Sequence, residues 1–465
     1  MLFNSLPFVL FFAGVLVVFH GVLRAWPMRK RFLLAASWAF YASWSPRFLL
    51  VLIGTTALDF GLARWIHAAR QQADGHARAR ALVVLSVTVN LGLLAAFKYG
   101  RFLYGSVATV VALPPTPGFL AVAVPLGISF YTFHSISYVV DTYRGLRPPT
   151  ESFPDFALYV AFFPQLVAGP ITRWGFFGPQ LEAQRSVRFA AVEQPLFLLA
   201  VGLVKKVIFA DSLGAFVDRV YADPGHAGWI EIWVALYAYA FQIYFDFSGY
   251  TDMAMGLAAL LGFRLPENFR HPYLAPGPSD FWRRWHISLS TWLRDYLYVS
   301  LGGNRRGALR TYINLFVTML LGGLWHGAAW TFVLWGGFHG VWLAAHRAVN
   351  ETRSAPPRTP LWLRRLVTFH LVCVGWVLFR AGSLATARAV FAGLFSGRLL
   401  WDAFPIGTIA IVAVGVATHA LAERENLETA WFRIPRVVQG AVYGAVLVLV
   451  GLFSAHSGRF IYFQF

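Results

Sequence analysis

Long apolar runs alternate with short polar segments along the chain. A run of about 20 apolar residues can cross the hydrocarbon core of a bilayer as a helix. The pattern therefore predicts an all-α polytopic membrane protein with about eleven transmembrane helices plus re-entrant segments. The apolar runs lie at residues 6–24, 31–46, 48–66, 81–99, 119–140, 192–215, 229–248, 311–333, 335–346, 361–380, 404–422 and 436–455.

The polar segments between the first five runs differ in charge. Segments 24–31, 64–80 and 141–155 are basic, whereas 113–118 has no charge and the connection between the second and third runs carries only Arg47. Basic loops tend to stay on the cytoplasmic side of a membrane. The alternation is consistent for all five runs if the N-terminus lies outside.

Two later segments differ from a plain membrane span. Residues 156–177, FALYVAFFPQLVAGPITRWGFF, are interrupted by Pro164 and Pro170. Irregular backbone at membrane depth needs protein or a water-filled cavity around it, so we expect a re-entrant segment here. Lys205 and Lys206 interrupt the next apolar run, and they must reach the membrane surface or face the protein interior.

Composition agrees with a membrane protein. Of the 465 residues, 58% are hydrophobic and 13% are charged, against about 25% charged in soluble domains. The net charge of +18 lies largely between apolar runs, which favours membrane orientation and contact with anionic lipid over nucleic-acid binding. The single cysteine, Cys373, excludes an intramolecular disulfide, and its apolar surroundings favour a packing role.

Two carboxylates lie among apolar residues in the sequence FQIYFDFSGYTDMAMG. These are Asp246 and Asp252, and a buried carboxylate must be paired. We expect their partners among the nearby arginines. A structural ion pair is favoured for Asp252, while structural and cavity roles stay equally open for Asp246.

The segment from Ser279 to about Ser300 has the periodicity of one amphipathic helix, which should stop before Gly302 and Gly303. This helix could rest on lipid headgroups, or its polar face could line the entrance of a cavity. The polar face would carry Arg283, His286, Ser290 and Arg294.

Two histidines stand in an apolar stretch with glycines beside them, His326 in GGLWHG and His339 in GGFHG. An ionisable group at membrane depth is costly unless it is paired or faces a wet cavity, which favours a functional site. A lone histidine on an apolar face is more often a satisfied core residue, so the residues alone leave both interpretations open. No ligand spacing such as H-E-x-x-H is present, and we expect no metal site.

Several long motifs closely resemble the membrane-bound O-acyltransferase family, and within it the bacterial alginate O-acetyltransferase branch. The two longest are FWRRWHISLSTWLRDYLYVSLGGNRRG and NLFVTMLLGGLWHGAAWTFVLWGGFHG. FFPQLVAGPITRW, YFDFSGYTDMAMGL, FRLPENFRHPY and the C-terminal FIYFQF also look like that branch. The resemblance implies a single membrane domain over 1–465, with its core at about 120–346, in which helices form a ring around a central funnel.

The resemblance also assigns roles to residues. The catalytic histidine of the family falls on His326, and a second polar position of the family falls on His286. Transfer of an acyl group from a thioester to a hydroxyl needs a base, and neutral imidazole suits that task. Trp325 or nearby backbone N–H groups could stabilise the oxyanion. We count as further candidate substrate-binding residues Asp246, Asn268, Arg283, Ser290, Arg294 and His339.

The function expected from this resemblance is transfer of an acetyl group from a cytoplasmic thioester, acetyl-CoA or an acyl carrier, towards hydroxyls of an exported alginate-like polysaccharide. The donor is a substrate, and no bound cofactor is expected. The expected partners are a periplasmic protein of the SGNH-hydrolase type, the polysaccharide and membrane lipids, and the expected location is the bacterial inner membrane. One alternative is D-alanyl or acyl transfer from a carrier protein to a cell-envelope polymer. Another is a transporter or flippase with a histidine proton relay.

The proposed topology can be tested by cysteine labelling. A cysteine introduced at Gln72, in a variant that lacks Cys373, should react with a membrane-impermeant maleimide only after the cells are opened. The reason is that the basic loop 64–80 should be cytoplasmic. Labelling of Gln72→Cys in intact cells would contradict this orientation.

Overall fold

The computed structural model describes a helical protein in two compact units. The first unit comprises 1–196 with 254–266, and the second comprises 197–253 with 267–465. Every regular element among the described residues is a helix, as the sequence predicts. The described residues are 1, 3–111, 113–114, 116–118, 123–183, 192–351, 359–399, 405–424, 427–453 and 460–461.

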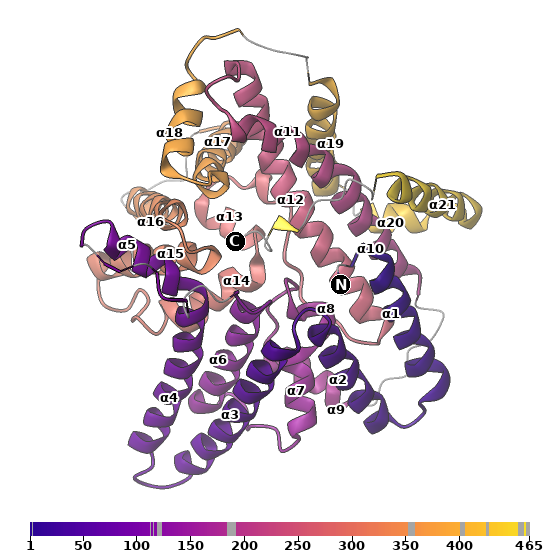
Figure 1. Ribbon diagram of the computed structural model, residues 1–465, viewed down its shortest axis with the longest axis vertical. Coiled ribbons are helices and arrows are strands. Elements are labelled where there is room, and N and C mark those ends of the chain that lie inside the picture. The colour runs from indigo at the N-terminus through magenta and orange to yellow at the C-terminus, as the bar shows by residue number, and fades with distance from the viewer. Residues whose placement is uncertain are drawn as a thin grey trace. The chain divides into compact units, whose positions relative to one another are not determined.

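The first unit begins with α1 and ends with α9, and it also contains the last turns of α12. Figure 1 shows these helices in indigo to magenta. Their bounds are α1 Leu6–Leu16, α2 Trp26–Ala42, α3 Pro46–Arg70, α4 His76–Leu94, α5 Gly100–Ala108, α6 Ile128–Arg144, α7 Phe153–Ala161, α8 Phe163–Leu166 and α9 Trp174–Glu182. Short π-helical segments at Val17–Val22 and Ala95–Tyr99 continue α1 and α4.

The second unit holds most of α10, the long helix α12 and everything that follows. The bounds are α10 Glu193–Leu203, a π-helical segment Val204–Ala210, α11 Asp211–Ala222, α12 Trp229–Leu260, a 3₁₀ turn Pro272–Leu274, α13 Pro278–Arg284, α14 Ile287–Trp292, a π-helical segment Leu293–Tyr298, α15 Ala308–His326, α16 Trp330–Glu351, α17 Leu361–Arg380, α18 Leu384–Gly393, α19 Ile406–Arg424, α20 Leu427–Phe432 and α21 Arg436–Phe453.

Five of the described helical segments are long and apolar enough to cross a membrane: Pro46–Arg70, His76–Ala108, Ala308–His326, Leu361–Arg380 and Arg436–Phe453. Large apolar side chains on these segments are exposed, among them Leu447, Val448 and Leu452 on α21. Contiguous exposed apolar surface of this kind suits lipid contact. The protein is therefore a multi-pass membrane protein, while the count of about eleven spans and the ring around a funnel stay predictions.

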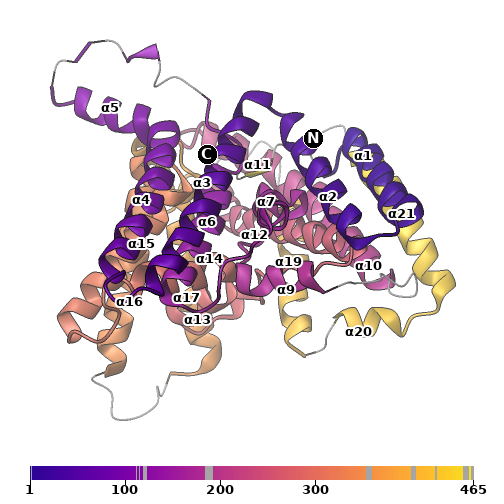
Figure 2. The same ribbon diagram turned by 90° about the horizontal axis from the view of Figure 1, so that it is seen from below.

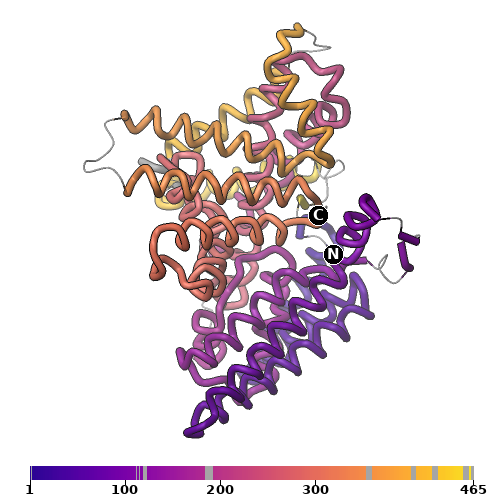
Figure 3. Tube along the Cα trace, turned by 90° about the vertical axis from the view of Figure 1, so that its left-hand side faces the viewer, coloured from indigo at the N-terminus to yellow at the C-terminus, as the bar shows by residue number. Residues whose placement is uncertain are grey.

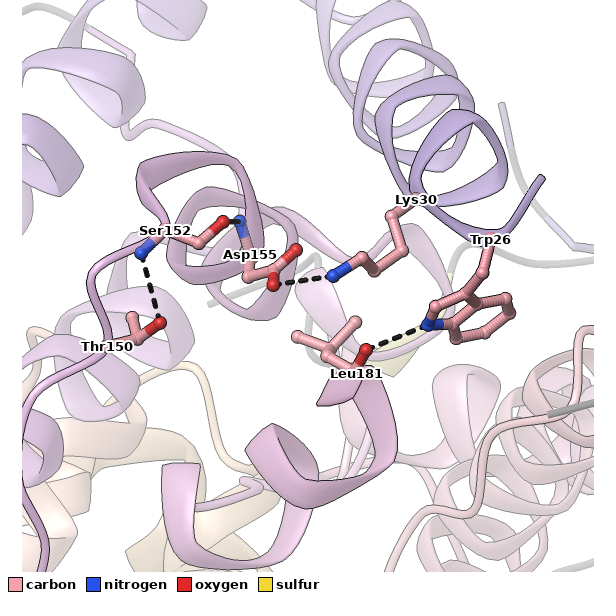
Figure 4. A network of polar contacts seen from close by, with 6 residues as sticks. All are labelled: Trp26, Lys30, Thr150, Ser152, Asp155 and Leu181. Carbon is pink, nitrogen blue, oxygen red and sulfur yellow. Dashed lines mark hydrogen bonds and ion pairs between the residues drawn. The ribbon is translucent and has the colours of Figure 1, made fainter. Parts of the chain in front are cut away.

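The segment 156–177 is interrupted as the prolines predict. It forms α7, the single turn α8 and the start of α9, and nearly all of its residues are buried. At the start of α7 the Ser152 side chain accepts a hydrogen bond from the Asp155 backbone N–H, and the Asp155 carboxylate pairs with Lys30 of α2 at 2.6 Å (Figure 4). Trp26 donates its indole N–H to the carbonyl of Leu181 in α9. These contacts surround the broken backbone with protein, which is the condition such a segment needs.

A buried carboxylate joins two of the candidate spans in the first unit. Helices α3, α4 and α6 lie side by side (Figure 2), and Asp59 of α3 is fully buried among them. The Ser86 hydroxyl donates to Asp59 Oδ1 at 2.6 Å, and Asn90 Nδ2 lies 2.9 Å from Oδ2. Among the residues that the structure describes, no lysine or arginine forms an ion pair with Asp59. Neutral donors on α4 therefore satisfy this carboxyl group.

The two carboxylates of α12 are paired with lysines, and our expectation of arginine partners was wrong. Lys205 Nζ lies 2.7 Å from Oδ2 of Asp252. Lys206 Nζ lies 2.6 Å from Oδ1 of Asp246 and 2.7 Å from Oδ1 of Asp211. The two lysines therefore face the protein interior. Their helix can approach α12 closely because Gly202 and Gly249 meet, where an added Cβ would lie under 3 Å from the opposite backbone.

The predicted continuous helix from Ser279 to Ser300 was also wrong. Helix α13 begins after Gly277 and ends at Arg284, and α14 begins at Ile287. The chain breaks at His286, whose backbone is left-handed with φ 42°. The polar face derived from helical periodicity consequently does not exist. Arg283 and Arg294 are exposed, whereas His286 is fully buried.

Replacement of Asp59 tests whether its hydrogen bonds hold α3 to α4. Asp59→Ala should lower the free energy of unfolding by about 1–3 kcal/mol, because Ser86 and Asn90 would lose a buried partner. Asp59→Asn should cost less, since the amide keeps an acceptor oxygen. Thermal unfolding of the detergent-solubilised protein measures both, with the exposed Asp74→Ala as the matched control. Equal melting temperatures for Asp59→Ala and Asp74→Ala would contradict this role.

Candidate active site

His326 is the last residue of α15, and the packing of that helix fixes its position. Helices α15, α16 and α17 lie side by side (Figure 3). The backbones of α15 and α16 meet at glycines, where a Cβ on Gly323 would lie 2.3 Å from the Phe332 carbonyl oxygen and one on Gly336 would lie 2.4 Å from that of Met319. Glycine is required at such contacts because any side chain would push the helices apart. The glycines near His326 thus allow the close approach of α15 and α16.

Aromatic side chains enclose the His326 ring, which is 4% exposed. The ring centre lies 5.0 Å from that of Trp325 and 5.1 Å from those of Trp335 in α16 and Phe379 in α17. Three helices therefore build the walls around this imidazole. Sequence reasoning missed Trp335 and Phe379 because neither stands near His326 along the chain.

His286 is brought next to His326 by the break between α13 and α14. The two ring centres lie 6.5 Å apart, and the His286 ring also lies 6.1 Å from Trp325 and 4.7 Å from Phe247 of α12. Burial holds the pKa of His286, which lies outside the five candidate spans, well below its ordinary value, so that the ring is neutral. A neutral imidazole has one ring nitrogen that can donate a hydrogen bond and one that can accept it.

Asn268 holds the backbone that follows this break. Its carbonyl oxygen accepts from the Ile287 N–H at 3.0 Å, and its Oδ1 accepts from the backbone and hydroxyl of Ser288 at 3.1 and 2.7 Å. A left-handed conformation is unfavourable for a residue other than glycine, and such strain persists only where surrounding contacts impose it. Asn268 therefore supports the position of His286. Its Nδ2 is buried and has no hydrogen-bond partner among the described residues.

The other candidates lie in different surroundings. His339 is fully buried in α16 among aromatic rings. Its ring centre lies 4.8 Å from that of Trp335 and 5.1 Å from that of Trp282. Asp246, besides its pair with Lys206, accepts a 2.7 Å hydrogen bond from the backbone N–H of Ile461, which ties the start of the C-terminal motif to α12. The residues 462–465 of that motif lie outside the described residues.

The three polar residues expected beside His286 do not converge on it. The Ser290 hydroxyl donates to the backbone carbonyl of Trp285, and Arg294 pairs with Asp295 at 2.6 Å. Arg283 is exposed. Within the described ranges, no group of three or more His, Cys, Asp or Glu side chains could hold a metal ion. The structure thus brings together His286, His326 and Trp325, with Asn268 behind them.

Comparison with known proteins gives a family match and several named relatives. Residues 147–384 match the model of the MBOAT, membrane-bound O-acyltransferase family. The chain is 42% identical to the probable alginate O-acetylase AlgI of Pseudomonas aeruginosa over 428 residues, which are 91% of this chain and 80% of that protein. It is 37% identical to the peptidoglycan O-acetyltransferase of Helicobacter pylori over 425 residues, 85% of this chain and 80% of that protein. Identity to the teichoic acid D-alanyltransferase of Bacillus subtilis is 27% over 270 residues, 55% of this chain and 68% of that protein.

Alanine substitution at neighbouring glycines tests the contact that places His326. Gly336→Ala should destabilise the protein by about 1–3 kcal/mol, because its Cβ would meet the backbone of α15. Gly337→Ala is the matched control on the same helix, since its Cβ would come no closer than 3.8 Å to any neighbour. Thermal unfolding in detergent measures the difference. Tolerance of Gly336→Ala equal to that of Gly337→Ala would show that this contact is not required.

Proposed function

The chain belongs to the membrane-bound O-acyltransferase family, and we propose that it transfers an acetyl group from a cytoplasmic thioester to hydroxyl groups of an exported, alginate-like polysaccharide. Family membership makes the chain an O-acyltransferase and sets aside the alternative of a transporter. Two relatives that match most of this chain are named for O-acetyl transfer, to alginate and to peptidoglycan. The D-alanyltransferase matches only about half of it, which favours acetyl transfer over D-alanylation.

The observation that supports this proposal best is the pair of buried imidazoles. His286 and His326 come from separate elements, yet their ring centres lie 6.5 Å apart inside an aromatic enclosure. One ring can take a proton from the acceptor while the other contacts the donor or the acceptor. A typical positioned base contributes about 10²–10⁴-fold to the rate.

In the proposed reaction His326 acts as the general base. As the acceptor hydroxyl attacks the thioester carbonyl, its proton moves to the His326 imidazole. The new C–O bond forms, the C–S bond breaks, and the imidazolium returns the proton to the departing thiolate. The Trp325 indole N–H is a donor that could stabilise the oxyanion that develops on the carbonyl. No metal or resident cofactor takes part in these steps, and the acyl donor is a substrate.

The aromatic walls have a chemical consequence. Trp325, Trp335 and Phe379 surround His326 and keep bulk water from it. Water would otherwise compete with the polysaccharide hydroxyl and hydrolyse the thioester. We propose His286 as the second catalytic residue and Asn268 as its positioning residue.

The remaining candidate residues do not take part in the proton transfer in this proposal. His339 packs behind Trp335, and Asp246 holds the C-terminal segment. Arg283, Ser290 and Arg294 remain candidates for contact with the phosphate groups of the donor.

The cellular setting is part of the same proposal. The basic loops favour a cytoplasmic side for the donor, and the proposed acceptor polymer would lie outside the cell. The enzyme would thus work in the bacterial inner membrane, with a periplasmic partner of the SGNH-hydrolase type that receives the acetyl group or completes its transfer to the polymer.

Substitution of His326 tests the proposed base. His326→Ala and His326→Gln should lower acetyl transfer at least about 100-fold, because neither side chain can accept the proton. Radiolabel transfer from acetyl-CoA by the detergent-solubilised protein, and the acetyl content of the exported polysaccharide, measure this effect. His226→Gln, at an exposed turn, is the matched control. Near-normal transfer by either His326 variant would exclude His326 as the base.

A further inference from the structure

The second unit contains a cavity away from the two catalytic candidates. It has a volume of about 420 Å³ and lies between the residues before α13, the C-terminal half of α16 and the N-terminal half of α17. Its polar lining includes His346, Asn350 and Arg364, and its apolar lining includes Trp342, Leu363 and Val367. The cavity is therefore amphipathic.

The positive charge in this cavity is not compensated. Arg364 is half-buried, and among the described residues its guanidinium forms no ion pair or hydrogen bond. The nearest acidic residue along α16, Glu351, is already bound to Arg347 at 2.7 Å and accepts a hydrogen bond from Tyr312. A half-buried guanidinium without a carboxylate favours an anionic ligand, above all a phosphate, with which arginine forms strong charge-assisted hydrogen bonds.

The apolar wall of the cavity continues into a surface suited to lipid. Val349 and Val367 line the cavity and are themselves exposed, and α17 also exposes Leu361, Trp362 and Leu366. An acyl chain that left the cavity would thus run along apolar side chains. A soluble anion such as free phosphate would make no use of this wall.

The position of Arg364 along the chain fits the same ligand. Helix α17 is one of the five segments able to cross a membrane, and Arg364 stands in its first turn. This turn should therefore lie near one membrane surface. Along the sequence, Arg353 and Arg358 of the linker 350–360 precede Arg364 and Arg365. Such a basic stretch beside a membrane span favours the cytoplasmic side, where anionic lipids are enriched.

We propose that this cavity binds an anionic phospholipid, whose phosphate is held by Arg364 and whose acyl chain lies against Leu363 and Val367. His346 and Asn350 stand beside the phosphate position. His346 also borders the entry to α13, since a Cβ on Gly277 would lie 2.8 Å from its Nε2. The bound lipid would therefore fill the space between α16, α17 and the start of the segment that leads to His286. This proposal does not depend on the proposed reaction.

Lipid binding to the purified full-length chain tests this proposal. Native mass spectrometry with phosphatidylglycerol should show a retained lipid, and Arg364→Gln should weaken its binding about tenfold, because a charge-assisted hydrogen bond is lost. Arg365→Gln is the matched control, since it removes the same charge from the next residue of the helix, which does not line the cavity. Arg364→Lys should retain part of the binding, and thermal unfolding checks that each variant is folded.

Three outcomes would overturn the proposal. Equal losses for Arg364→Gln and Arg365→Gln would mean that only the overall charge matters. Equal binding of phosphatidylcholine and phosphatidylglycerol would exclude selection of an anionic headgroup. Displacement of phosphatidylglycerol by acetyl-CoA, abolished by Arg364→Gln, would identify the cavity as a site for the soluble donor.

Discussion

The close contact between α15 and α16 is the constraint on which the candidate site depends. Gly323 and Gly336 allow the two backbones to approach within a distance that no side chain would permit. Because of this approach, the end of α15 carries His326 against Trp335 of the next helix. In a membrane protein, van der Waals contact and interhelical hydrogen bonds replace the hydrophobic effect as the force between helices, so small residues have a larger role than they would in water.

The second catalytic candidate, His286, owes its position to an interruption of regular helix. His286 adopts a left-handed conformation at the break between α13 and α14, and Asn268 satisfies the backbone that follows it. The strain is maintained because these contacts and the burial of His286 impose it. A continuous helix would instead have aligned His286 with the exposed Arg283. The break separates the buried imidazole from the charged surface.

Several buried polar groups inside the two units have compensating partners. Lys205 and Lys206 pair with carboxylates of α12, while Asp59 is held by neutral donors from α4. Pairing of this kind offsets the cost of moving charge away from water. Arg364 led to the proposed lipid site, since its guanidinium lines a cavity in which the described residues include no carboxylate.

The sequence by itself determined the membrane class, the interrupted segment 156–177, the internal pairing of the α12 carboxylates and the resemblance that singled out His326. These features follow from hydropathy and local order, which are encoded within a few turns of chain. Only the tertiary structure decided that lysines pair with the carboxylates, that the chain breaks at His286, and that Phe379 packs against the His326 ring. Each of these depends on contacts between residues far apart in sequence, and a periodicity of 3.6 residues carries no information about them.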